Sequence, residues 1–530
     1  MTDTPARIAR PRPLQLLGRL LDDPTLVTTV QGLAPRTLGA LVNAIGLADA
    51  GEIVALATTE QLQRVFDEDL WRSARPGQDE TFDPERFALW LEIMLEAGEE
   101  LTARKLVELP EDLVTLALHR HVLVINIDEL AVEMSGYEQD DDVLTMTEKA
   151  LDSCLYHEIA EHRIISRRPD GWDAIVAVLT ALDRDHHDYL QRLLERCCYV
   201  SSEWIEDNGG LYSVLTSEEM LETDAAADRE DRRAREGFIA PSAAASFLSL
   251  ARVTPLEELE KARVSDPVTR AYFRSYQPAV AAAPAGARRP APPAPPAMTA
   301  AVLGELLKDE LPDEARATLL LGGRAGAADP AALFRGALEE LRAADADLAA
   351  PRMQELSYLA NVLVAGCSFG GRRFRAVEAV EAVVCACNLG LEHLLRPAGP
   401  RRAAEDARAV LARDGADKLF RVGWHLLFRD VVLPAGRALA QLLARRATSA
   451  DLGRVAAAVR AAVDAGTPWT ARGRLPAVAG VLDAPTLAAV TGLLGECPAL
   501  AGPLRGDPRV PGLIATRAQV QRVQAFVGTL

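Results

Sequence analysis

Residues 33 to 71 most constrain what this chain can fold into, because three helix-sized apolar patterns follow one another there with almost no loop between them. In the first pattern, apolar side chains from Leu38 to Ile45 recur at i, i+3, i+4 and i+7, which is the spacing of one helix face. Pro35 suits the first turn of that helix. Helices this short are marginal alone in water and depend on packing against neighbours. The stretch therefore predicts a compact stack of short helices.

Two capping boxes indicate where the next helices begin. Asp49 is followed by Glu52 at the capping-box spacing, and Thr58 is followed by Gln61 at the same spacing. In this arrangement each side chain accepts a hydrogen bond from the other residue's backbone N–H. Two further helix starts are therefore predicted, the second of which leads to Trp71.

The remaining patterns are also mainly helical, with two exceptions. Residues 122–127 are β-branched or aliphatic except for Asn126, and residues 155–166 follow no clean helical period, so we expect a minor β contribution there. We predict a mainly α fold, with superhelix-like stacked short helices in the first half and an Ala-rich helical bundle or stack in the second.

One stretch marks a domain boundary. Residues 278–297 are rich in proline and alanine and have no apolar period, which favours an extended, semi-rigid spacer. The expected organisation is a short-helix stack over 1–75, a helical domain with minor β structure over 76–277, the linker 278–297, and an Ala-rich helical domain over 298–530.

Composition excludes several classes of partner. The net charge of -18 argues against nucleic acid and against an anionic membrane surface, because binding phosphates needs a basic surface. No stretch has the roughly 20 apolar residues of a membrane span. Acidic residues concentrate in the first half and arginines in the second, so the halves either attract each other or simply carry solvated charge. Seven cysteines, without a secretory N-terminal pattern, predict a cytoplasmic protein.

Several short runs carry a resemblance to known families. These runs are Leu33-Ala-Pro35, Ile45-Gly-Leu47, Asp49-Ala-Gly-Glu52 and Thr58-Thr-Glu-Gln61-Leu62. Over its opening 75 residues or so, the chain resembles the helical N-terminal domain of MgtE-type magnesium transporters, which implies a superhelix of short helices. Together with residues 231–238 and 352–375, the same runs resemble an uncharacterised bacterial domain-of-unknown-function family over most of the chain. That second resemblance implies no activity.

A histidine-rich segment suggests metal chemistry. His157, Glu158, Glu161 and His162 are candidate ligands of a metal-dependent hydrolase. A zincin helix needs its histidines at i and i+4, whereas these stand at i and i+5 and would point to opposite faces of a strand. Hydrogen-bonded surface pairs at i, i+4 are the alternative interpretation.

Two cysteines near the middle of the second half suggest a zinc site. Cys385 and Cys387, with Cys367 and His393, have the right donor atoms. However, the apolar spacing around them is helical, which turns the first two thiols away from each other. We therefore expect buried thiols that act as small hydrophobes.

The best candidate for binding an anion or a partner is a glycine- and arginine-rich turn. Its residues are Gly370, Gly371, Arg372, Arg373 and Arg375. Glycines let backbone donors curl around an oxyanion, and a helix N-terminus is expected to follow. A helix–helix turn whose arginines meet the acidic first half of the chain is the alternative.

An acidic run offers a divalent-cation site, because carboxylate oxygens are the ligands that Mg²⁺ and Ca²⁺ prefer. Solvated loop charge is the alternative, since no EF-hand spacing is present. The residues are Asp128, Glu129, Glu133, Glu138, Asp140, Asp141 and Asp142.

No catalytic motif stands out, and no cofactor is expected. The sequence favours a non-enzymatic scaffold or regulatory protein that binds a protein partner through its stacked helices. The alternatives are the metal-dependent hydrolase and a cation-responsive regulatory module.

Overall fold

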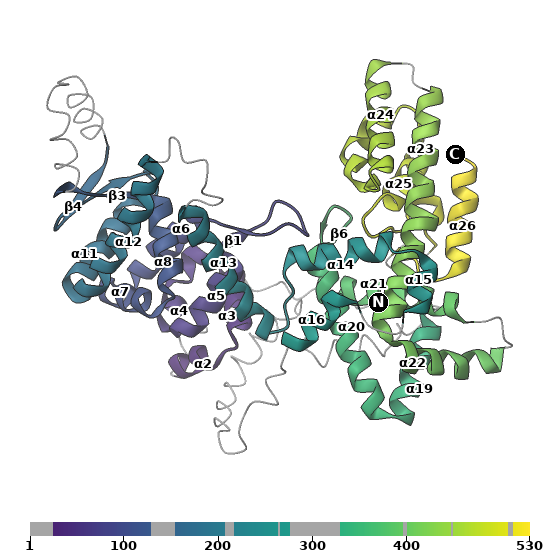
Figure 1. Ribbon diagram of the computed structural model, residues 1–530, viewed down its shortest axis with the longest axis horizontal. Helices are drawn as coiled ribbons and strands as arrows, with labels where there is room; N and C mark the ends of the chain where they lie inside the picture. The colour runs from purple at the N-terminus through teal and green to yellow at the C-terminus, as the bar shows by residue number, and fades with distance from the viewer. Residues whose placement is uncertain are drawn as a thin grey trace, which may run out of the picture. The chain divides into compact units, whose positions relative to one another are not determined.

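The computed structural model describes residues 25–128, 154–206, 217–262, 266–275, 329–395, 400–446, 449–506 and 512–530. The chain divides into two compact units (Figure 1). The first holds the described residues up to Arg72 and from Thr81 to Arg232, and the second holds Ser73–Glu80 and the described residues from Arg233 onward. Both units are mainly helical, as predicted. The predicted linker 278–297 lies outside the described residues.

The first unit opens with the predicted short helices. They are α2 (Leu26–Gly32), α3 (Pro35–Ile45), the 3-10 turn η1 (Leu47–Asp49), α4 (Gly51–Leu56) and α5 (Thr59–Asp69). The capping box at Thr58 is confirmed, because the Gln61 N–H donates to Thr58 Oγ1 at 3.2 Å and the Thr58 N–H donates to Gln61 Oε1 at 2.9 Å. The capping box predicted at Asp49 and Glu52 is wrong. Asp49 lies inside η1, and α4 begins one residue later than that box requires, without a side-chain cap.

Longer helices complete the first unit. They are α6 (Pro84–Glu96), α7 (Glu99–Glu108), α8 (Glu111–His121), α11 (Trp172–Asp185), α12 (His187–Glu206) and α13 (Ser217–Arg235). A two-residue ladder joins β1 (Trp71–Arg72) to β2 (Thr81–Phe82). One apolar core runs through the unit from Leu26 to Ala225. Within it the rings of Phe66 and Trp90 meet edge to face, with centroids 5.1 Å apart.

The predicted β contribution is a three-stranded antiparallel sheet in the first unit. Its strands are β3 (Val122–Asn126), β4 (Tyr156–Ile159) and β5 (His162–Ser166), in the order β3, β5, β4. A two-residue turn joins β4 to β5, and Ala160 adopts a positive φ of 49° there. Helices α8 and α12 pack beside β3 (Figure 1).

The second unit is built around two long helices, α21 (Ala376–Leu394) and α22 (Pro400–Leu427). They cross at glycines: a Cβ added at Gly390 would lie 2.0 Å from the Leu419 carbonyl oxygen, and one at Gly423 would lie 1.9 Å from the Ala386 carbonyl oxygen. Only glycine permits backbones to approach this closely. Within α22 and the turn after it, the stretch 419–428 is almost entirely buried.

Further helices surround this crossing. They are α14 (Pro241–Val253), α15 (Leu256–Lys261), α16 (Pro267–Ser275), α19 (Ala332–Ala344), α20 (Ala346–Gly366), the π-helical turn η3 (Phe428–Val432), α23 (Leu433–Arg446), α24 (Ala450–Asp464), the 3-10 helix η4 (Pro468–Val478), α25 (Ala484–Leu493), the 3-10 turn η5 (Gly502–Leu504) and α26 (Arg517–Gly528). In the described part of the chain, no helix combines the length and the apolar character needed to cross a bilayer.

Candidate functional site

The predicted glycine-rich turn is a β-hairpin in the second unit, not a plain helix–helix turn. Strands β6 (Ser368–Phe369) and β7 (Arg372–Arg373) pair through a two-residue loop, and α21 begins three residues later, as expected. Gly370 and Gly371 have φ values of 65° and 89°. Tight hairpin loops favour residues that tolerate positive φ at both central positions, so the two glycines are explained by the turn itself.

Two of the three predicted arginines are paired with carboxylates of the same unit. Arg372 donates to both oxygens of Glu378 at 2.7 and 2.6 Å, and these bonds lower the pKa of the Glu378 carboxyl. Arg373 donates to Glu80 at 3.0 Å. At the third position, the Arg375 backbone N–H donates to Glu378 at 3.1 Å. Arg372 and the Arg375 backbone thus fix the start of α21, whereas Arg373 binds Glu80 of the segment Ser73–Glu80.

A larger hollow lies beside this hairpin, within the second unit. The loop 73–80, the turn 370–371, η4 and α25 line a cavity of about 970 Å³. A neighbouring cavity of about 740 Å³ shares three of its lining residues, Arg472, Leu487 and Thr491. Both volumes lie in the range of small-molecule sites. Sequence reasoning missed this hollow, because its walls come from segments nearly 400 residues apart.

Arg472 is the half-buried arginine of this hollow. Its guanidinium lies against the glycine turn, since a Cβ at Gly371 would be 3.6 Å from its Nη1. Burial lowers the pKa of Arg472. Arg472 has no hydrogen bond or ion pair in the described part of the chain. It is therefore a half-buried positive charge without a counter-ion.

The aromatic wall of the cavity is backed by a second arginine. The guanidinium of Arg252 stands 4.4 Å from the ring centroid of Trp469 and 5.4 Å from that of Trp424. Burial lowers its pKa, and its Nη2 atom has no hydrogen-bond partner. Glu496, which lines the cavity, accepts a hydrogen bond from the Ser368 N–H at 2.6 Å.

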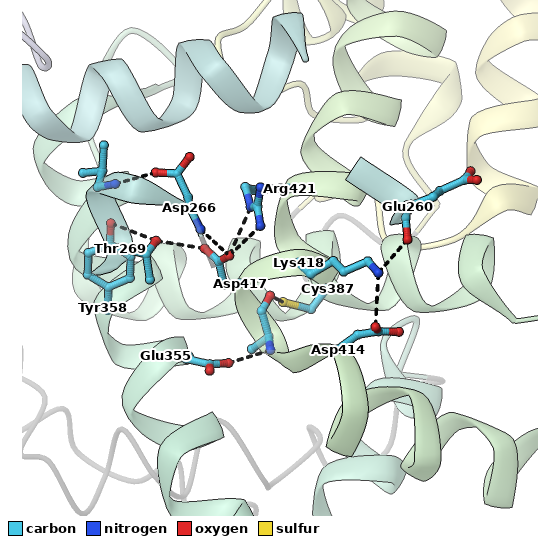
Figure 2. A network of polar contacts seen from close by, with 12 residues as sticks. Glu260, Asp266, Thr269, Glu355, Tyr358, Cys387, Asp414, Asp417, Lys418 and Arg421 are labelled. Carbon is cyan, nitrogen blue, oxygen red and sulfur yellow. Dashed lines mark hydrogen bonds and ion pairs between the residues drawn. The ribbon is translucent and has the colours of Figure 1, made fainter. Parts of the chain in front are cut away.

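A buried polar network lies elsewhere in the second unit, where α22 is kinked at Gly415 (Figure 2). Asp417 accepts hydrogen bonds from Thr269 at 2.9 Å and from Arg421 at 3.1 and 2.8 Å. Glu355 accepts one from the Ala416 N–H at 2.7 Å, which caps the helix that resumes after the kink. Burial raises the pKa of Glu355. Each carboxylate has its partners, so this network holds helices together.

The three cysteines of the candidate zinc site are buried, as predicted. Cys385 and Cys387 both lie inside helix α21, and burial raises the pKa of each thiol. Cys367 is also buried, and burial raises its pKa as well. His393 instead contacts Glu260 at 2.7 Å. A thiol that resists ionisation is a poor nucleophile and a poor metal ligand.

The histidine segment of the first unit has a geometry that the sequence argument missed. We expected His157 and His162 on opposite faces of one strand, but the turn at Ala160 places them on paired strands. His157 is opposite Ile164 and His162 is opposite Ile159, so the two histidines share one face of the sheet. His162 is almost fully buried, and its Nδ1 has no hydrogen-bond partner.

The two glutamates of the segment do not lie on the same face as the two histidines. Glu158 lies on the other face, where it accepts hydrogen bonds from Arg163 at 2.9 and 2.6 Å. Glu161 is in the turn, 4.0 Å from His162. The predicted i, i+4 pairs are therefore wrong, because the segment is a hairpin. Within the described residues, no three His, Cys, Asp or Glu side chains gather as a metal site would require.

A buried histidine near this sheet carries the largest histidine shift of the first unit. His119, at the end of α8, has a fully buried side chain that lies 3.5 Å from Glu218. Burial, together with the nearby Arg167, lowers its pKa to about 4. At neutral pH His119 is therefore uncharged.

Most of the first unit corresponds to a known family. Residues 4–208 match the family of unknown function DUF6178. The DUF6178 segment contains the short-helix stack, the sheet and His119, whereas residues 231–238 and 352–375, which also carried the resemblance, lie outside it. No curated protein and no solved structure matches the chain.

The DUF6178 segment also contains the acidic run considered as a cation site. Of that run only Asp128 is described; its backbone N–H donates to the Asn126 side chain at 3.0 Å. The other six acidic residues lie outside the described residues. The cavity around Arg472 belongs to the part of the chain beyond the family match.

Proposed function

We propose that this protein is a non-enzymatic scaffold or regulatory protein that binds a protein partner through the surfaces of its stacked helices. The packing of the first unit carries the proposal. Helices of six to thirteen residues, from α3 to α7, each bury one face in a shared core and expose side chains on the other. Stacks of this kind form extended surfaces suited to partner proteins.

The charged side chains of this unit support the same conclusion. Arg196 reaches from α12 to Glu111 at 3.0 Å and to Asp112 at 2.5 Å, at the start of α8. Arg86 reaches Asp69 at 2.6 Å. These side chains tie helix to helix. None of the seven cysteines forms a disulfide, which suits the reducing cytoplasm that we propose as its location.

The outer face of α12 offers the most promising contact in this unit. Tyr199 has 64% of its surface exposed. It lies three residues after Arg196 and seven after Arg192, so the three share one helix face. Tyrosine and arginine are enriched among the residues that dominate binding energy at interfaces.

The test uses the full chain, tagged and captured from its host's lysate, followed by reconstitution with the purified partner. We expect a complex that survives gel filtration and is weakened by Tyr199→Ser. The matched control is Val253→Ser in the second unit, where the side chain is 66% exposed. A purified partner that fails to form a complex, or equal effects of the two variants, contradicts the proposal.

A metal-dependent hydrolase remains the second candidate, favoured by the shared face of His157 and His162 and by the free Nδ1 of His162. Its test is metal analysis of the purified protein. Stoichiometric zinc that is lost in His162→Ala supports the enzyme. Wild-type protein without bound metal after growth in zinc-supplemented medium opposes it.

A divalent-cation-responsive regulatory module is the third candidate, and it rests on the acidic run and on the resemblance to magnesium-transporter domains. A cation that binds only the folded protein raises its melting temperature. We expect Mg²⁺ to do so in the wild type and not in Asp140→Asn with Asp141→Asn. Equal shifts in both proteins contradict this function.

A further inference from the structure

The cavity lined by Arg472 combines a positive charge with apolar walls. We propose that it binds a small monocarboxylic acid with an apolar body, whose carboxylate pairs with the Arg472 guanidinium. This proposal does not depend on the partner-binding function, because it concerns a different unit and a different class of ligand.

The unpaired charge is the first argument. Taking a guanidinium out of water without a counter-ion is unfavourable, so buried charges are normally paired. Arg335, a buried guanidinium of the same unit, follows that rule, since it pairs with Asp329 and Glu381, each at 2.8 Å. Arg472 does not, although burial lowers its pKa. Arg472 lines both cavities, so its guanidinium N–H groups are available to a ligand there.

The charge of the cavity selects a monoanion. Besides Arg472, its lining includes one arginine, the exposed Arg75, and one carboxylate, Glu496. The lining therefore carries a net charge of about +1, and Glu496 disfavours a second negative charge on the ligand. A guanidinium matches the two oxygens of a carboxylate with two parallel hydrogen bonds. A dianionic phosphate lacks the additional cations that it would need here.

The remaining lining suits an apolar body. Trp469, Leu475 and Leu487 provide aromatic and aliphatic surface, and Thr491 adds a hydroxyl shared by both cavities. The ring of Trp469 is held in place by Arg252 and by an edge-to-face contact with Phe428, with centroids 6.3 Å apart. A volume of about 970 Å³ accommodates an aryl or medium-chain alkyl group.

Calorimetric titration of the full-length protein at low salt tests the proposal. The probes are 3-phenylpropionate and octanoate, with 3-phenylpropionamide as the uncharged match and phenyl phosphate as the dianion. We expect at least one of the two carboxylates to bind at millimolar concentration or better, with the amide and the phosphate weaker. Equal binding of acid and amide, tighter binding of the phosphate, or no binding of either carboxylate overturns the proposal.

Variants of η4 locate the site. Arg472→Met should weaken carboxylate binding at least about tenfold, because hydrogen bonds to a charged group are lost. Arg474→Met is the matched control, since Arg474 is on the same element and lines a different hollow. Arg472→Lys keeps the positive charge but loses the two parallel N–H donors of the guanidinium. It should therefore bind the carboxylate more weakly than the wild type does. If Arg472→Met binds the carboxylate with wild-type affinity, Arg472 does not hold the ligand. If the methionine variant does not fold, wild-type affinity in Arg472→Lys contradicts the proposal in the same way.

Discussion

The crossing of α21 and α22 makes a quantitative prediction about the stability of the second unit. In Gly423→Ala the new methyl group would lie 1.9 Å from the Ala386 carbonyl oxygen, whereas real Cβ atoms essentially never come within 3.0 Å of another heavy atom. Because the obstructing atom is backbone, it cannot turn aside. The helices must separate by about 1 Å, which forfeits a quarter to a half of the dispersion energy of the affected contacts.

The expected loss of unfolding free energy in Gly423→Ala follows from two opposing effects. Overpacking a core costs about 1 to 3 kcal/mol, and the better helix propensity of alanine returns up to about 1 kcal/mol. For a clash against backbone we take the upper end, which leaves a net loss of about 2 kcal/mol. For a unit of this size, that lowers the melting temperature by about 4 to 8 °C.

Thermal unfolding followed by circular dichroism and calorimetry measures this effect. Gly453→Ala in α24 is the matched control, because nothing lies within 4 Å of the Cβ that it adds. It should raise the melting temperature slightly, by helix propensity alone. If Gly423→Ala melts within about 1 °C of the wild type, the close crossing is wrong.

Two further predictions concern buried charged and titratable groups. Burial lowers the pKa of His119 to about 4 from an unfolded value of 6.5, so the unfolded chain binds the proton more readily than the folded chain does. The free energy of unfolding should therefore fall as the pH drops from 6.5 toward 4, by up to about 1.4 kcal/mol per pH unit. His119→Gln should flatten that part of a curve of denaturant midpoint against pH, and an unchanged slope refutes this. Asp417→Ala leaves the buried Arg421 without its partner and should cost about 3 to 5 kcal/mol by urea unfolding. Asp451→Ala, which removes an exposed ion pair with Arg454, should change stability by less than about 1 kcal/mol, and similar losses in both variants contradict the role of the network.

Local sequence signals predicted much of the fold. The helix face from Leu38 to Ile45, the box at Thr58 and the strand within 122–127 all depend on residues close together in the sequence. The box at Asp49 failed although its spacing was the same. Tertiary packing draws Asp49 into a 3-10 turn, and spacing alone does not reveal that competition.

The sites were harder to predict, because they depend on contacts distant in the sequence. The turn between β4 and β5 uses Ala160 at positive φ, where asparagine or glycine is the usual signal, so the shared face of His157 and His162 was missed. The hairpin arginines were identified, but their partners Glu80 and Glu378 were not. Arg472 is one of many arginines in its half of the chain. Only the fold shows that this one lines a cavity and has no counter-ion among the described residues.

Hydrogen exchange of the full-length protein, with and without its captured partner, tests the central proposal of a binding protein most directly. The proposal predicts protection of amides on the exposed helices of the first unit, with α12 around Tyr199 among them, and recovery of the partner chemically unchanged. Protection confined to segments outside these helices, or a partner recovered as a cleaved or modified product, would contradict it.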